Sequence, residues 1–304
     1  MKSVRNLVFS SVACLAALGT AAAQESGAEA EEPSLWERLA AERNVTLPPR
    51  YGVGLIYVGY SHDIRIDELR IASDDGRRGG IDFVESDDSE MTNRQLQLRA
   101  DAWLLPFLNV FAQVGAADNT LSTNVSVDGE DIVAFVGDES RCAPDASPRP
   151  ALCDQTFTAV GKQEPGGEVY TLGALLALGR GSYFALGGLA YTWADLDTAD
   201  APMETLALSP RIGRRFGLGN HGELAVYVGA LHIDAHVEFS RSATVPTPNG
   251  STIVTLTADI TNKDPWSYVL GTNWDMQNGW NLQAELGHGA SRDGFIASLT
   301  RRFP

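Results

Sequence analysis

The alternation of apolar and polar residues is most regular near the C-terminus. Between Asn281 and Leu286 the even positions are apolar and the odd positions are polar, and after a break at 291–294 the alternation resumes as far as Phe303. Successive side chains of a strand point to opposite faces, so a period of two over about ten residues predicts strands with one apolar and one polar face. Such strands are typical of a β-barrel that spans a bilayer, with apolar side chains toward lipid and polar side chains toward the lumen.

The same pattern recurs along the chain and predicts ten strands. They lie at 51–61, 94–104, 107–117, 170–178, 183–193, 203–216, 223–239, 266–276, 280–288 and 295–303. Short turns are expected at 105–106, 180–181, 216–222 and 277–279, and long loops at 62–93, 118–168, 194–202 and 240–265. Outer-membrane barrels have short periplasmic turns and longer external loops. We therefore expect both termini in the periplasm and the long loops outside the cell.

The connection 118–168 leaves the strand number open. Its segments Leu121–Val127 and Ile132–Val136 also alternate. They either extend a hairpin beyond the membrane or add two strands, which would make twelve. The expected fold is thus all-β, a transmembrane antiparallel up-and-down β-barrel of ten strands, with twelve as the alternative, over residues 50–304.

The N-terminus predicts export. Lys2 and Arg5 precede an apolar run at 7–18, and the alanines at 21–23 offer a cleavage site. A basic start, a short apolar core and small residues before the cleavage point are the features of a secretory signal peptide, here 1–23. This places the mature chain outside the cytoplasm.

Residues 24–49 are expected to form an acidic linker and a short periplasmic helix. Ser34 and Glu37 have the spacing of a capping box, and Pro48 and Pro49 would end the segment before the first strand. The helix would either plug the periplasmic mouth of the barrel or, alternatively, lie against the membrane interface or fray in solution.

The net charge disfavours one class of function, and the cysteines predict a disulfide. The formal net charge is −16, which disfavours binding to nucleic acid. Cys142 and Cys153 remain after signal cleavage. In an oxidising compartment they are expected to form a disulfide that staples a surface loop.

Charged residues at inward positions are the first candidate site. Both signs occur among them: Arg99, Asp101, Arg211, Glu223, Glu285 and Arg302. Eight-stranded barrels have filled interiors and barrels of sixteen or more strands hold water channels, so ten or twelve strands predict a narrow or plugged lumen. These residues either pair to hold the barrel in register or line a selective path for small solutes.

A second candidate lies in the seventh strand. His232, Asp234, His236 and Glu238 occupy alternate positions and therefore share one face. Imidazole and carboxylate groups bind divalent cations or act as an acid–base pair. Alternate side chains are nearly 7 Å apart along a strand, so a metal site would need a ligand from elsewhere, for which Asp259 is the candidate. The alternative is a solvated hairpin face, and no other cofactor is expected.

The chain resembles Gram-negative outer-membrane β-barrel proteins. The last strand ending in Phe303 resembles their C-terminal signature, although Pro304 follows the Phe that such proteins usually carry last, and the hairpin from Leu98 to Gly115 is similar to hairpins of this class. The resemblance implies an outer-membrane location, assembly by the barrel-assembly machinery, contact with lipid and lipopolysaccharide, and a monomer.

The expected function is structural or surface ligand binding, with a narrow channel for small solutes as the alternative. Asp234 and His236 are similar to the Asp–His pair of the omptin proteases, which are ten-stranded barrels. The second carboxylate pair of that family has no counterpart, because Asp128 and Asp131 have a different spacing. An omptin-like surface endopeptidase is therefore a distant third hypothesis, and no strong enzymatic signature stands out.

Overall fold

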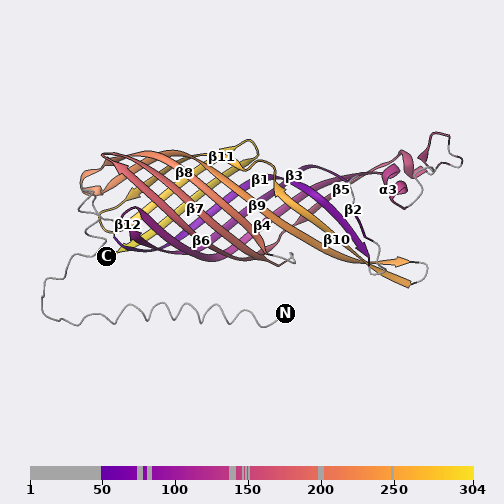
Figure 1. Cartoon of the computed structure of the whole chain (residues 1–304), viewed down its shortest axis with the longest axis horizontal. Coiled ribbons are helices and arrows are strands. Elements are labelled where there is room, and N and C mark those ends of the chain that lie inside the picture. Colours follow the sequence, from indigo (N-terminus) through magenta and orange to yellow (C-terminus); the bar gives the residue numbers. More distant parts are fainter. Residues whose placement is uncertain are drawn as a thin grey trace.

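The protein is a β-barrel from which several strands extend at one end (Figure 1). The computed structural model describes residues 49–73, 78–80, 84–136, 142–145, 147, 149, 151–197, 202–247 and 250–304. The signal peptide and the short helix expected within 1–48 lie outside these residues.

Strands make up most of the described chain. They are β1 (Tyr51–Ser73), β2 (Arg78–Gly80), β3 (Val84–Leu105), β4 (Leu108–Asp128), β5 (Thr156–Gln163), β6 (Gly166–Arg180), β7 (Tyr183–Leu196), β8 (Met203–Gly217), β9 (Glu223–Thr247), β10 (Gly250–Asn262), β11 (Trp266–Asp275), β12 (Trp280–Gly289) and β13 (Arg292–Phe303). Short helices are α3 (Gly129–Val136), η3 (Ala151–Asp154) and η4 (Gly219–His221). In the described part of the chain, no helix is long and apolar enough to cross a membrane.

Ten strands form the closed ring, as the sequence predicts. Neighbours along the chain pair antiparallel through β3, β4, β6, β7, β8, β9, β11, β12 and β13. β1 then closes the ring by pairing with both β13 and β3, with Tyr51 opposite Phe303 on one side and opposite Ala102 on the other. β2, β5 and β10 add to strand ends outside this ring.

Two of the predicted tight turns depend on glycine. Gly181 between β6 and β7 has φ of 61°, and Gly279 between β11 and β12 has φ of 81°. Residues with a Cβ atom rarely adopt this left-handed conformation. The end of the barrel that carries these turns is called the short-turn end below, and the opposite end is called the long-loop end.

The exterior of the ring is apolar. Leu98, Ile212 and Leu286 are 53%, 64% and 60% exposed, and water would not favour so large an apolar band on a monomer. Exposed aromatic residues lie at both edges of the band: Tyr51, Tyr183, Phe216, Trp280 and Phe303 at the short-turn end, and Tyr57, Tyr191, Trp266, Tyr268 and Phe295 at the long-loop end. An apolar belt between two aromatic girdles is the surface of a barrel that spans a membrane.

Four strands of the ring are about twice as long as a bilayer needs. β1, β3, β4 and β9 have 23, 22, 21 and 25 residues, whereas a tilted spanning strand needs about 9–11. Their surplus pairs beyond the ring, so the expected loops 62–93 and 240–265 contain strands, which corrects that expectation. Beyond the bilayer both faces of a strand can be polar, and the alternation that reveals a spanning strand is lost.

The alternative of twelve strands is wrong. Leu121–Val127 continues β4 and pairs with β5, whereas Ile132–Val136 belongs to helix α3. A run of five residues is too short to separate a strand from a helical turn by its pattern. Cys142 and Cys153 form the expected disulfide, with their Cα atoms 5.5 Å apart.

Candidate functional site

Two clusters of polar side chains bridge strands inside the barrel. The first, called the Asp101 cluster, consists of Arg99, Asp101, Asn109 and Arg302. The side chain of Asp101 is fully buried. Its carboxylate accepts hydrogen bonds from Arg302 Nη1 at 3.0 Å and from Asn109 Nδ2 at 2.7 Å. Arg99 Nε lies 3.6 Å from the same carboxylate. β1 lies between the strands of Asp101 and Arg302, and Gly52 of β1 leaves the room, because a Cβ atom there would lie 2.5 Å from Asp101 Oδ2.

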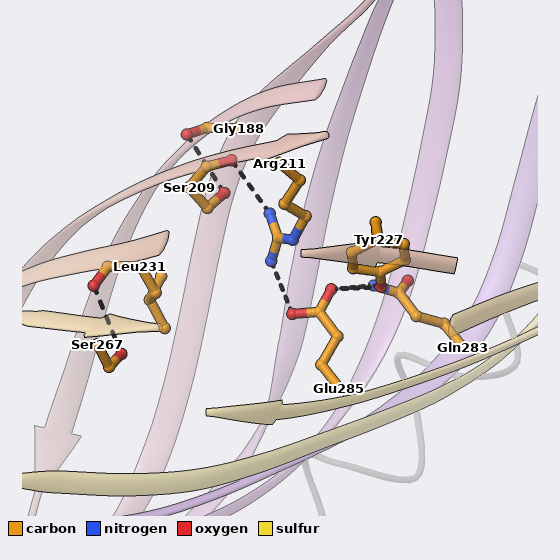
Figure 2. Close-up of polar contacts among 8 residues, drawn as sticks. All are labelled: Gly188, Ser209, Arg211, Tyr227, Leu231, Ser267, Gln283 and Glu285. Atoms are coloured by element: carbon orange, nitrogen blue, oxygen red, sulfur yellow. Dashed lines mark hydrogen bonds and ion pairs between the residues drawn. The ribbon is translucent and has the colours of Figure 1, made fainter. Parts of the chain in front are cut away.

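The second, called the Glu285 cluster, consists of Arg211, Tyr227, Gln283 and Glu285 (Figure 2). Glu285 is 2% exposed. Its carboxylate accepts from Arg211 Nη2 at 2.8 Å, from the Tyr227 hydroxyl at 2.7 Å and from Gln283 Nε2 at 2.6 Å. The cluster joins β8, β9 and β12 along the wall of the lumen.

The six charged residues predicted to face the lumen thus form three groups. Besides the two clusters, Glu223 lies 3.7 Å from Arg215, and both side chains are half-exposed. A buried charge that keeps its partner avoids the large cost of an uncompensated ion. Opposite charges therefore lie together across strands, and both roles predicted for these residues, holding the barrel in register and lining a path for small solutes, stay predictions.

A cavity of about 1460 Å³ occupies the lumen. Its lining begins at the short turns, with Pro106 and Gly181, and ends near Tyr60 and Arg292. Besides the polar clusters, it includes an apolar group that the sequence analysis missed: Ile56, Val58, Leu231, Ile233, Val269 and Ile296. The alternation near Ile56 and Val58 is loose because apolar residues stand on both faces of the strand there.

A cluster of buried apolar side chains, with the buried amides of Asn93 and Asn119 among them, lies in the lumen beyond the cavity. This apolar cap comprises Ile64, Met91, Ala117, Leu121, Val169, Ala194, Leu196, Met203, Val237 and Ile260. Val169 and Ala194 are completely buried, and Met91 lies opposite His62, the next inward residue of β1 after Tyr60. The cap residues do not line the cavity. The lumen therefore reaches the short turns but ends at the cap on the long-loop side.

The histidine column lies on the outer face of β9. His232 packs edge-on against Trp266, with ring centroids 4.7 Å apart. Asp259 lies opposite Glu238, and Arg70 bridges the two carboxylates at 2.6 and 3.4 Å. Within the described ranges, no group of three His, Cys, Asp or Glu side chains is placed to hold a metal ion. Metal binding and omptin-like chemistry at Asp234 and His236 stay predictions.

The sequence matches no protein-family model. It also matches no curated protein. Among solved structures, it is similar to the CymD monoaromatic hydrocarbon channel (13% identity, 84% of this chain and 89% of that chain, TM-score 0.31). It is also similar to the outer-membrane protein OprG from Pseudomonas aeruginosa (14%, 83% and 96%, 0.33) and to the transport unit of the autotransporter AIDA-I from Escherichia coli (9%, 84% and 90%, 0.35). Similarity at this level concerns the barrel fold alone.

Proposed function

We propose that this protein is an outer-membrane barrel whose lumen binds a small amphipathic molecule. The observation that carries the proposal is the cavity of about 1460 Å³, which has both apolar and charged walls and ends at the apolar cap. Ligand sites are concave, mostly apolar, and supplied with a few polar groups that orient the ligand. A lumen of this kind has the composition of a binding site.

A permanently open channel for ions is disfavoured by the same features. Water-filled barrels have polar interiors along their whole length, whereas dry apolar constrictions block conduction. The apolar cap is such a constriction. Passage of solutes would require the cap to open, so the narrow-channel function is the second candidate.

The proposal includes a location, which the apolar belt supports because it fits a bilayer. We propose that the barrel lies in the outer membrane, with both termini and the short turns in the periplasm and the strand extensions outside the cell. In that orientation the cavity faces the periplasm. The barrel would be a monomer in contact with lipid and lipopolysaccharide, delivered by the barrel-assembly machinery.

Filling the lumen tests the proposal. Ala207 lines the cavity, and Ala207→Trp should weaken the binding of hexanol at least tenfold, measured by calorimetry on the mature chain refolded in neutral detergent. Ala174→Trp places the same bulk on the outer face of β6 and is the matched control. Equal binding by both variants, or no binding by the unmodified protein, would overturn the proposal.

A further inference from the structure

One lumenal arginine differs from the others. Arg292 begins β13, lines the cavity where it meets the apolar cap, and is 4% exposed. Its Nη1 donates to the Pro265 carbonyl at 3.4 Å, while its Nε and Nη2 are buried without a hydrogen-bond partner. By contrast, Arg99, Arg211 and Arg302 each lie within 4 Å of a carboxylate. Arg292 has no such ion pair with any residue that the structure describes.

A second unpartnered donor group stands beside it. His62 lies directly opposite Arg292 in the β1–β13 register and is also 4% exposed. Its Nδ1 is buried and has no hydrogen-bond partner. Two neighbouring strands therefore present three unpaired nitrogen atoms at one place.

Tyr60 does not satisfy these groups. Its ring centroid lies 5.9 Å from the Arg292 guanidinium carbon, which allows a cation–π interaction. That interaction uses the face of the guanidinium group, so the N–H donors in its plane still need acceptors. A buried cation without acceptors is strongly unfavourable, and native proteins pair such groups with an ion, a side chain or ordered water.

We infer that Arg292 and His62 bind the anionic headgroup of the lumenal ligand, and that the ligand is an apolar carboxylate. The inference rests on the proposed function of the lumen. A guanidinium group matches a carboxylate with two parallel hydrogen bonds, and His62 supplies a further donor when its Nδ1 carries the proton. Val58 and Ile296 line the cavity next to this place, with Leu231, Ile233 and Val269 nearby on β9 and β11. The carboxylate lies at the closed end, and the apolar body extends along these side chains.

The test compares hexanoate with hexanol, which share an apolar chain and differ in charge. Calorimetry on the mature chain in neutral detergent should give at least tenfold tighter binding for hexanoate. Arg292→Gln should remove this difference, so that hexanoate binds the variant no more tightly than hexanol does. Arg94→Gln, on the exposed outer face of β3, should behave as the unmodified protein does.

The outcomes separate the two proposals. If hexanol binds and hexanoate binds no better, or if Arg292→Gln keeps the preference, the anionic site is overturned while lumenal binding stands. If neither compound binds, the proposed function fails first. Should Arg292→Gln not fold, as judged by its electrophoretic mobility before and after heating, Arg292→Lys and His62→Leu replace it. Lysine should retain part of the preference for hexanoate, and His62→Leu should reduce that preference.

Discussion

Glycines that face the lumen decide which polar groups can meet. The side chain of Tyr227 lies over Gly271, where a Cβ atom would come within 2.3 Å of the Tyr227 ring. This close approach lets the Tyr227 hydroxyl reach Glu285 from β9 although β11 lies between their strands. A missing side chain thus positions the Glu285 cluster.

Gly271→Ala should therefore destabilise the barrel. The added methyl group overpacks the lumen and should lower the free energy of unfolding by about 1–3 kcal/mol, measured by urea denaturation in detergent micelles. Gly187→Ala is the control, because a Cβ atom there meets nothing within 4 Å. Equal stability of the two variants would contradict this account of the cluster.

At the scale of the elements, the apolar cap separates the cavity from the strand extensions. It is built where β7 ends and β8 begins, with Leu196 and Met203 buried in one cluster with inward residues of β1, β3 and β9. An apolar constriction excludes ions because water does not fill it stably. The cap should therefore set the conductance of the protein.

The double variant Leu196→Ser and Met203→Ser should conduct. Hydroxyl groups hydrate the constriction, so single-channel current in planar bilayers should rise at least tenfold above that of the unmodified protein. Ile253→Ser makes the same type of change in β10, outside the cap, and should leave the current unchanged. A double variant as silent as the parent would mean that another barrier closes the lumen.

Elements inside the bilayer were predictable from sequence, and those outside were not. Lipid on one side and the lumen on the other impose the period of two that reveals β12 and β13. β10 and the part of β3 beyond the ring have no lipid on one side, so nothing requires a period of two in their sequences, and loops are predicted there. The inward charges could also be predicted, but their partners could not. Arg211 and Glu285 are 74 residues apart, and their contact depends on registers that no local pattern specifies.

The whole molecule depends on its apolar belt for its place in the membrane. Leu98 lies in the middle of this belt, opposite the exposed residues Leu55 and Val114. A charge on the lipid face near the midplane costs about 2–4 kcal/mol. Outward positions of the ring near the midplane should therefore not tolerate a charged side chain without a loss of stability.

Leu98→Arg should lower the free energy of unfolding from lipid vesicles by about 2–4 kcal/mol, measured by titration with denaturant. Asn124→Arg adds the same charge on an exposed position of β4 beyond the ring and should be nearly neutral. A comparable loss in both variants would show that the belt is not in contact with lipid.

The ring closes between the first and the last of its strands. Tyr51 of β1 pairs with Phe303 of β13, so the contact that completes the barrel joins the two ends of the described chain. Pairing between residues so far apart in sequence forms late in folding, because the chain between them must first be ordered. Until β13 arrives, β1 has an unpaired edge that can bind other chains. Secretion of a chain truncated before Arg292 would therefore yield an open, aggregation-prone sheet. Pairing of β13 with β1 is the step that closes the barrel and removes its last exposed strand edge.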